Sequence, residues 1–438
     1  MSANTPNDLV RFMARLAPPV ERRESPAVIA AFFLFFFMWA GYFMVRPLRE
    51  TIGTIIGREQ IANLWIVTWV ASLLIIPLYG AIVAHVRRSV FLPVAYGLVA
   101  LVLALIGVAL QGGQINMAAG KFFYVFISVV NLFLLSIFWS FLLELFDAEQ
   151  SKRLFGVIAA GGSAGALLGP LLSDQLVRTI GNNGLLFLGA VMFVAAIFCQ
   201  RLLLAIWRER SSDPVADRAL GGNMFAGVTI ILRSPYIIGI ALFVVMISAV
   251  NTLLYFEQLR LVQVNYPDVM DRTRIFARFD WIAQGLTMAS QIFLTGRIAK
   301  RWGLMALVMF VPLTMVGGFL ALAATGTLTV LAVVYVLRRA MEYAFVRPGR
   351  EMLWSPLDKE TKYKAKSTVD VPIYRGADAL SAQINKALEG LGFGPAALAM
   401  LGAGVAVVWA AIGWWLARRY EAGAAANEQA AAAVEARN

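Results

Sequence analysis

The chain has 438 residues, of which 60% are hydrophobic and only 15% are charged, and its net charge is +12. Soluble globular proteins contain roughly 45–50% apolar and about 25% charged residues, so this composition excludes a soluble fold and an intrinsically disordered chain. One cysteine and one histidine exclude a disulfide scaffold and argue against an internal zinc or haem site. We therefore predict an integral membrane protein without metal or cofactor. We attribute its excess of cations to cytoplasmic loops facing anionic membrane lipid rather than to nucleic-acid binding.

Twelve apolar stretches follow one another along the chain, each close to the roughly 20 residues that cross a bilayer as a helix. None of them alternates with a period of two residues, so the pattern predicts an all-α membrane protein rather than a β-barrel. The first six stretches are 27–46, 61–84, 90–110, 122–145, 154–176 and 184–206, and the second six are 236–258, 275–297, 303–325, 327–346, 367–389 and 394–417.

The order of the stretches predicts two pseudo-symmetric six-helix bundles, at 27–206 and 236–418, joined by a central loop at 207–235. Short basic turns recur at equivalent places in the two halves, which favours the major-facilitator-like layout; the alternative is that any short cytoplasmic loop attracts Lys and Arg. Lys and Arg gather on the side of the N-terminal tail. Both tails, at 1–26 and 419–438, are therefore predicted to be cytoplasmic, and the first stretch is predicted to be a retained helix rather than a signal peptide.

Charged residues fall inside several predicted helices, where an ion costs at least ~2.5–3.5 kcal/mol on insertion scales and usually faces a cavity or a partner. Arginines in such a cavity suit an anionic substrate, because the guanidinium group pairs with two oxygens of a phosphate or carboxylate. Carboxylates there balance the arginines or bind a coupling proton. The residues concerned are Glu257, Arg278, Asp280, Arg338, Arg339, Glu342, Asp370, Arg375 and Asp378.

Private pairing is the competing interpretation of these charges. Glu342 lies three residues after Arg339, and Asp378 lies three residues after Arg375, so each pair can simply neutralise itself on one helical face. Arg278 and Asp280 point to different faces of a helix, so at least one of them is expected to pair elsewhere. For any single residue the two interpretations are balanced; for the set as a whole, a polar translocation cavity is favoured.

Two further patterns concern the ends and the packing of helices. The sequence Val45-Arg-Pro-Leu-Arg-Glu50 has a counterpart in Val346-Arg-Pro-Gly-Arg-Glu351, and a proline at a helix end favours a local break. Arg49 is therefore a candidate gate or substrate contact, with a snorkelling arginine as the alternative. Gly161, Gly165 and Gly169 form a smooth stripe that predicts close helix packing.

No enzyme signature occurs in the chain. There is no phosphate-binding G-x-x-x-x-G-K-[ST] loop, so ATP-driven pumping by this chain is not expected. His85, the one histidine, lies in a basic turn without evident triad partners, and its simplest interpretation is an ordinary loop residue. We predict that the protein is not an enzyme.

Three stretches resemble the ATP:ADP antiporter family of nucleotide transporters. They are Tyr42-Phe-Met-Val-Arg-Pro-Leu-Arg-Glu-Thr51; Trp139 with Glu149-Gln-Ser-Lys-Arg-Leu-Phe155; and Glu342-Tyr-Ala-Phe345 with Pro356-Leu-Asp-Lys-Glu-Thr-Lys362 and Lys364-Ala-Lys-Ser-Thr-Val-Asp370. The resemblance implies a major-facilitator-like fold and, for a bacterial relative, a place in the inner membrane. For the best-known members it implies exchange of ATP for ADP.

The chain also departs from that family. Arg49 stands where the nucleotide exchangers have a functional lysine, and the stretch 128–136 lacks the acidic residue of their fourth helix. The lysine of their Gly-Lys-Ser motif in the eleventh helix is replaced around Arg375. Their acidic residue in the seventh helix falls within about a residue of Glu257. These changes keep basic character at two places and favour an anion-transporting relative with a changed substrate.

The sequence therefore predicts a twelve-helix secondary transporter that works by alternating access on a small organic anion, such as a nucleotide or phosphorylated metabolite. Substrate contact is predicted for Arg49, Arg278, Arg375 and Glu257, and coupling or charge balance for Asp280, Asp378 and Glu342. A proton-coupled transporter of another amphiphilic or carboxylated compound is the first alternative, and a non-transporting membrane scaffold is the second. The substrate, direction, coupling and oligomeric state stay open.

Overall fold

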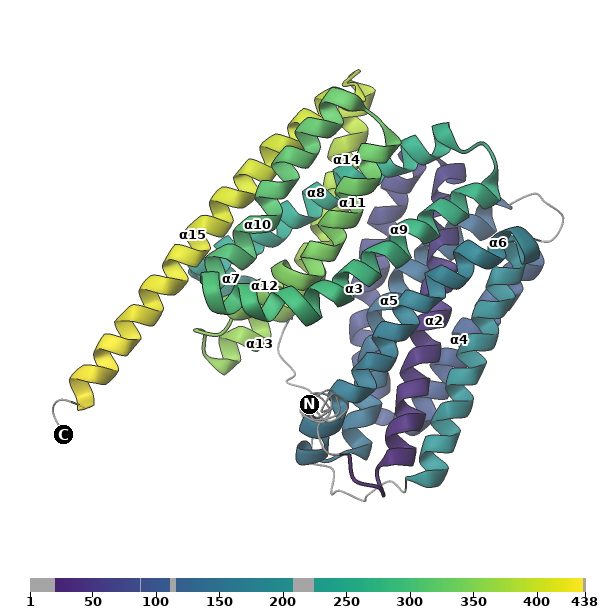
Figure 1. Cartoon of the computed structure of the whole chain (residues 1–438), viewed down its shortest axis with the longest axis horizontal. Helices are drawn as coiled ribbons and strands as arrows, with labels where there is room; N and C mark the ends of the chain where they lie inside the picture. The colour runs from purple at the N-terminus through teal and green to yellow at the C-terminus, as the bar shows by residue number, and fades with distance from the viewer. Residues whose placement is uncertain (1–19, 87, 111–115, 208–223, 436–438) are drawn as a thin grey trace, which may run out of the picture. The chain divides into compact units, whose positions relative to one another are not determined.

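The protein is described by a computed structural model, in which residues 20–86, 88–110, 116–207 and 224–435 are placed (Figure 1). Most of the predicted N-terminal tail (1–26) and of the predicted central loop (207–235), and the last residues of the C-terminal tail, lie outside the described residues. Within the described ranges the chain is almost entirely helical and contains no strand, which confirms the predicted all-α class.

The helices follow the predicted stretches closely, each of which lies on helical residues to within a residue at its ends. Three one-turn π-helical segments (η) interrupt the α-helices. In chain order the elements are α2 (Ser25–Ile56), α3 (Arg58–His85), α4 (Arg88–Ala109), α5 (Met117–Leu145), α6 (Ala148–Ile206), α7 (Met224–Arg233), α8 (Pro235–Asn265), α9 (Val269–Ser290), η1 (Gln291–Thr295), α10 (Gly296–Thr325), α11 (Leu328–Met341), η2 (Glu342–Val346), α12 (Arg347–Leu353), α13 (Lys359–Thr368), η3 (Val369–Ile373), α14 (Tyr374–Gly390) and α15 (Pro395–Glu435).

Seven helical stretches of the described chain are long and apolar enough to cross a membrane: Ser25–Ile56, Ser89–Ala109, Met117–Leu145, Glu149–Ile206, Pro235–Asn265, Gly303–Thr325 and Pro395–Gly423. The stretch in α6 holds two predicted spans, which meet at Gly181; its φ of 70° is left-handed and breaks the helical path there. Other predicted spans are interrupted by π-turns, such as those of α9 with η1 and α14 with η3. Most of these also carry the charges that lower their hydropathy.

Contacts divide the chain into two compact units. Unit 1 comprises Met1–Thr51, Leu78–Asp217 and Thr273–Trp281, and unit 2 comprises Ile52–Pro77, Arg218–Arg272 and Ile282–Asn438. The first part of α3 thus belongs to unit 2, and a short piece of α9 belongs to unit 1. Each unit therefore draws a segment from the other half of the sequence.

In unit 1, α2 and α6 approach each other at the glycine stripe. A Cβ atom built on Gly161, Gly165 or Gly169 would lie only 2.3–2.5 Å from a backbone carbonyl oxygen of α2, so no side chain fits there. Ser173 continues the same line, and its hydroxyl donates to the carbonyl of Met44 at 2.7 Å. This close approach orients the remaining faces of α2 toward α5 and α9.

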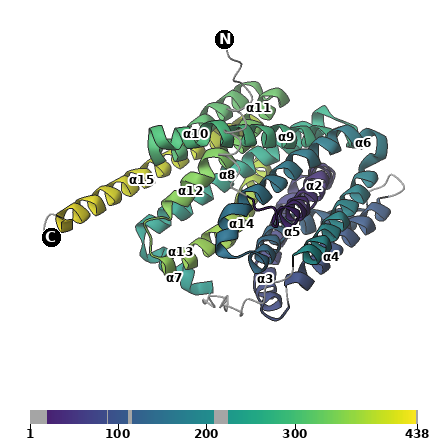
Figure 2. The same ribbon diagram turned by 60° about the horizontal axis from the view of Figure 1, so that its bottom comes forward.

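In unit 2, α8, α10 and α15 share an apolar core, and α10 and α15 run side by side in both ribbon views (Figures 1 and 2). Phe243 of α8 and Trp409 of α15 meet there with ring centroids 5.8 Å apart.

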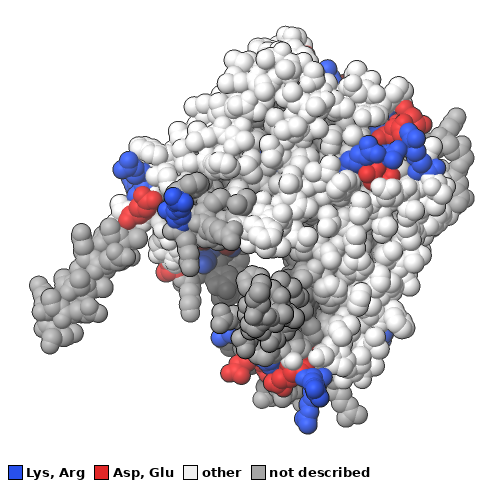
Figure 3. All heavy atoms as spheres, viewed as in Figure 1, with Lys and Arg blue, Asp and Glu red and all other residues white. Residues whose placement is uncertain are grey.

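Apolar side chains also face outward in both units: Leu74 is 67% exposed, Phe198 is 69% exposed, and most of the surface visible in Figure 3 carries no charge. Such extensive apolar exposure is typical of helices that face lipid.

Candidate functional site

The predicted site residues divide between the two units. Arg49, Arg278 and Asp280 belong to unit 1, whereas Glu257, Glu342, Arg375 and Asp378 belong to unit 2. Each group is built from different elements and is described by itself.

The first cluster of unit 1 forms where the last third of α2 meets α9. The Arg46 guanidinium donates to both carboxylate oxygens of Asp280 at 2.7 Å, and Asp280 is only 3% exposed. Arg49 donates to Glu50 at 2.6 Å and to the Ser128 hydroxyl at 3.0 Å. Two cations and two anions are therefore held together among apolar helices, an arrangement that is stable only while each charge keeps its partner.

The second cluster of unit 1 is centred on Asp174 of α6, which is 3% exposed. Its carboxylate accepts hydrogen bonds from Arg274 at 3.0 Å, from Arg278 at 3.1 Å and from the indole N–H of Trp281 at 3.2 Å. These three donors are spaced four and three residues apart on one face of α9. The Arg278 side chain remains 42% exposed.

The two clusters confirm that Arg278 and Asp280 point to different faces of α9 and find separate partners. Asp174 was not among the site residues predicted from the sequence. Its signal was visible, because it is a carboxylate at the end of an apolar stretch, four residues after Pro170. Arg46 was likewise noticed only as part of a repeated hexapeptide, although it holds the most buried aspartate of α9.

In unit 2, Arg338 of α11 connects three elements. It donates to Glu342 at 2.6 Å and also to the side-chain carbonyl of Asn251 on α8. The Asn251 amide donates in turn to the Tyr374 hydroxyl at 3.3 Å. Glu342 is thus paired with the arginine one helical turn before it, at the point where α11 becomes the π-helical η2.

Asp378 and Arg375 lie on α14, directly after η3. The Ser248 hydroxyl donates to Asp378 at 2.5 Å, whereas the Arg375 guanidinium is 3.7 Å from the same carboxylate. The predicted pairing of Arg375 with Asp378 is therefore present but loose. Backbone irregularity at η2 and η3 coincides with these charges, and π-turns inside α-helices are frequent at functional sites.

Glu257, near the end of α8, is held by a bidentate contact with Arg260 at 2.8 and 2.5 Å. It also lines a small crevice of unit 2 with Phe256, Phe319 and Glu389. Glu389 accepts a hydrogen bond from Arg58 at 2.8 Å. The local charges at this end of unit 2 are therefore already matched within the unit.

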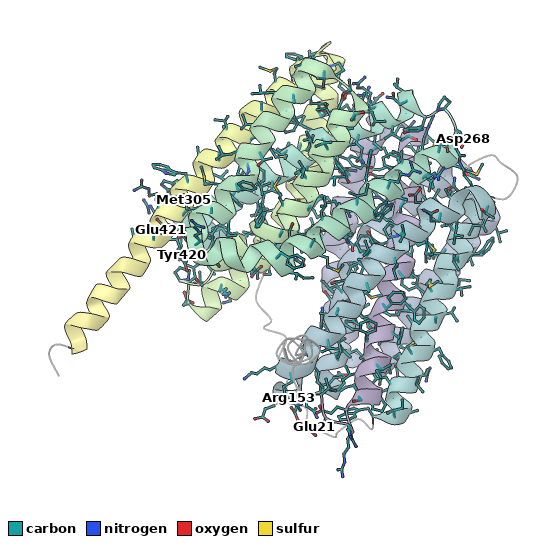
Figure 4. The ribbon with its side chains drawn as sticks, viewed as in Figure 1. Glu21, Arg153, Asp268, Met305, Tyr420 and Glu421 are labelled. Carbon is teal, nitrogen blue, oxygen red and sulfur yellow. The ribbon has the colours of Figure 1, made fainter. Side chains whose placement is uncertain are left out.

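A further ionic contact lies at the end of unit 1 where α2 begins. Arg153 donates to both oxygens of Glu24 and is 3.6 Å from Glu21, and Figure 4 labels Glu21 and Arg153 at this end. Burial raises the pKa of the Glu24 carboxyl, but Arg153, the backbone N–H of Glu21 and the Gln150 amide together hold that pKa below its usual value. Glu24 therefore ties the start of α2 to α6 as an ionised group.

The part of the chain that the structure describes contains no group of three or more His, Cys, Asp or Glu side chains arranged to hold a metal ion. The side chains gathered in these clusters carry guanidinium, carboxylate, hydroxyl and aromatic groups.

Comparison with known proteins agrees with the sequence motifs. The chain is 24% identical over 288 residues to the ADP,ATP carrier protein 1 of Chlamydia trachomatis, covering 57% of this chain and 54% of that protein. It is 22% identical over 307 residues to the ADP,ATP carrier protein 1 of Chlamydia pneumoniae, covering 61% and 60%. The predicted resemblance is confirmed. The matched part spans little more than half the length of these curated relatives, and no family model matches the chain.

Solved structures agree on the fold. The nucleoside transporter NupG superposes with a TM-score of 0.63 at 13% identity, covering 90% of this chain and 99% of that one. A bacterial homologue of the human lysosomal transporter Spinster superposes with a TM-score of 0.60 at 13% identity, covering 92% and 99%. The fold is therefore major-facilitator-like, and the chain is an integral membrane protein. These relatives and structures are carriers and transporters rather than enzymes.

Proposed function

We propose that this protein is a secondary transporter that exchanges small organic anions of the nucleotide class across a bacterial inner membrane, with both termini in the cytoplasm. The observation that carries the proposal is the set of ionised side chains kept among apolar helices in a chain similar to ADP,ATP carrier proteins. Guanidinium groups bind phosphates through paired hydrogen bonds, which suits such a cargo.

In this proposal the predicted bundles at 27–206 and 236–418 alternate between openings on the two membrane faces. Arg49, Arg278, Arg375 and Glu257 contact the substrate, and Asp280, Asp378 and Glu342 balance charge. Each of these arginines is already paired with a carboxylate of its own unit, so an incoming phosphate competes with an internal anion. This competition lowers the net affinity for the substrate, so the substrate can be released again.

The test is exchange in liposomes that contain the purified protein. Internal ATP or ADP is expected to stimulate uptake of labelled ATP, and Arg49→Gln or Arg278→Gln is expected to lower that uptake at least tenfold. Arg418→Gln, which removes an exposed cation from the middle of α15, is the matched control and keeps full uptake. Absence of uptake across a panel of nucleotides and phosphorylated metabolites would contradict the proposal. If cellular function also survived Arg278→Ala with Arg375→Ala, a scaffold role would be favoured instead.

Proton coupling is the second candidate, and the environment of Asp378 favours it. The Ser248 hydroxyl donates to this carboxylate at 2.5 Å, and the Arg375 guanidinium lies 3.7 Å from it, so Asp378 is a carboxylate in a polar setting that could carry a coupling proton. A proton-coupled transporter loses uptake when a protonophore is added and in Asp378→Asn. An exchanger keeps counterflow of labelled substrate when the protonophore is added.

A further inference from the structure

The face of α2 that meets α5 is divided into an aromatic part and a cationic part. Phe35, Trp39, Tyr42, Arg46 and Arg49 are spaced alternately four and three residues apart, so their side chains form one stripe along the helix. The first three are aromatic and the last two are arginines. By the helical rise of 1.5 Å per residue, Trp39 and Arg46 are separated by about 10 Å along the axis.

The opposing face of α5 is divided in the same way. At its aromatic end Phe138 stacks on Phe35 with ring centroids 4.0 Å apart, and the Trp139 ring lies 5.4 Å from Phe35. At its polar end Ser128 accepts a hydrogen bond from Arg49, and the Tyr124 ring lies 5.1 Å from the same guanidinium. Aromatic side chains of α2 therefore contact aromatic side chains of α5, and the arginines of α2 contact the polar end of α5. The two helices are antiparallel, and both segments belong to unit 1.

Burial distinguishes two rings of this aromatic group from the rest. Phe35 and Phe138 are almost completely buried, as expected of rings that only pack a core. Trp39 and Trp139 keep part of their surface exposed, as do the side chains of Arg46 and Arg49, at 16% and 14%. Both tryptophans are fixed from behind, because Trp39 contacts Phe43 at 5.2 Å and Trp139 contacts Phe155 at 5.0 Å. Two indoles and two guanidinium groups on the paired helices α2 and α5 thus keep part of their surface accessible.

A lipid-facing role does not account for this stripe. Exposed residues at the start of α2, such as Phe33 at 43%, lie on the roughly opposite face of the helix. Contact with lipid would also not explain two arginines on the same stripe as Trp39, because a charge in contact with acyl chains is costly. An amphiphilic ligand with a flat apolar end and an anionic end matches both parts of the stripe.

We infer that Trp39 and Trp139 form a stacking surface for the base of a nucleotide whose phosphates reach Arg46 and Arg49. The inference rests on the proposed function and assigns separate subsites within it. Base stacking on an aromatic side chain tolerates different bases, because every base has a π-face. The arginines provide the affinity for the phosphates, which must displace Glu50 from Arg49 and Asp280 from Arg46. The two ends therefore contribute independently to binding.

The test compares binding of ATP and of inorganic triphosphate to the purified full-length protein. Trp39→Leu and Trp139→Leu are each expected to raise the Kd for ATP roughly tenfold, toward the lower end of the range for loss of one stacked ring, and to leave the Kd for triphosphate unchanged. Arg49→Gln is expected to raise both values. Trp39→Phe, which keeps a stacking ring, retains most of the ATP affinity, and Phe33→Leu is the matched control for loss of an aromatic group from α2.

The outcomes separate the two levels of the argument. Wild-type protein that binds ATP, with Kd values unaffected by either tryptophan variant, overturns the stacking surface and leaves the transporter intact. Parallel losses for ATP and triphosphate in Trp39→Leu, with Trp39→Phe no better, also overturn it, because they indicate a general packing role. Wild-type protein that neither binds nor transports any nucleotide overturns the proposed function together with the subsite.

Discussion

The two units bury their charges in different ways. In unit 1 the two buried aspartates take partners from elements far apart in the chain: Arg46 and Asp280 are separated by 234 residues, and Asp174 and Arg278 by 104. In unit 2 the ion pairs of the predicted site residues, Arg338–Glu342, Glu257–Arg260 and Arg375–Asp378, are three or four residues apart, and the long-range pair Arg58–Glu389 is more exposed, at 32% and 25%.

This difference has an energetic consequence. Two residues three or four positions apart on one helix stay neighbours however that helix is packed, so such a pair constrains the tertiary structure weakly. A pair between distant helices exists only while those helices stay packed, and losing one member leaves a buried charge without compensation. The ion pairs of unit 1 should therefore control stability, whereas those of unit 2 should be replaceable at low cost.

The largest effect is expected for Arg46→Gln, which leaves the carboxylate of Asp280 at 3% exposure without its cation. Loss of one member of a buried pair costs about 3–5 kcal/mol of unfolding free energy, and we expect the lower end because Arg46 is partly exposed. Thermal unfolding in detergent measures the change. The double variant Arg46→Gln with Asp280→Asn should regain at least half of the lost stability; a double variant as unstable as the sum of the two singles would contradict a direct pairing.

A smaller effect is expected for Asp174→Asn, which removes the shared partner of Arg274 and Arg278. Both arginines reach solvent, so the loss should be about 2 kcal/mol rather than the full cost of a buried pair. Arg278→Gln is the internal comparison and should cost less than half as much, because Arg274 still neutralises the carboxylate. Equal losses in the two variants would show that Asp174 depends on Arg278 alone.

In unit 2, Arg375→Gln should change the unfolding free energy by only about 0.5 kcal/mol, the usual value of a pair one turn apart. Asp378 keeps its hydrogen bond from Ser248, so no buried charge is left without a polar partner. The same variant should nevertheless lower transport strongly, and measuring melting temperature and uptake on one preparation separates the two effects. A melting temperature lowered as far as in Arg46→Gln would remove the contrast between the units.

The smallest effect concerns pH and the contact between Glu24 and Arg153. The folded pKa of Glu24 lies below the unfolded value of about 4.3, so the ionised group stabilises the fold above that pH. This contribution disappears as the pH falls through the folded pKa. The melting temperature of Glu24→Gln should therefore fall less between pH 7 and pH 4 than that of the wild-type protein. An identical pH dependence in both proteins would show that Glu24 does not contribute.

Much of the fold could be predicted from the sequence, because bilayer-length apolar stretches leave few alternatives to helices. Each predicted stretch lies on helical residues, and the breaks at Gly181 and Gly303 separate neighbouring stretches. The π-turns were not predicted. Two of them, η2 and η3, lie beside the charged parts of α11 and α14, and hydrophobic periodicity does not predict such a local change of helix type.

The candidate site was predictable in composition but only partly in its pairing. The costly charges could be located individually, and the pairing of Arg375 with Asp378 followed from helical spacing. Asp174 was overlooked because a single carboxylate near the end of an apolar stretch resembles an ordinary helix terminus. The stripe on α2 was not predicted, because helical spacing alone does not show which face of α2 meets α5.

The sequence by itself determined that the chain is helical, lies in a membrane and retains ionised side chains at membrane depth, because hydropathy, helical spacing and charge are properties of short segments. Only the tertiary structure decided that Arg46 holds Asp280, that Asp174 gathers two arginines, and that Trp39 of α2 and Trp139 of α5 both stay partly accessible. Those facts depend on which faces of distant helices are packed together. Close glycine-mediated contact between α2 and α6 fixes one face of α2 in unit 1, and the ring of Phe35 packs over Gly162 of α6 beside that contact.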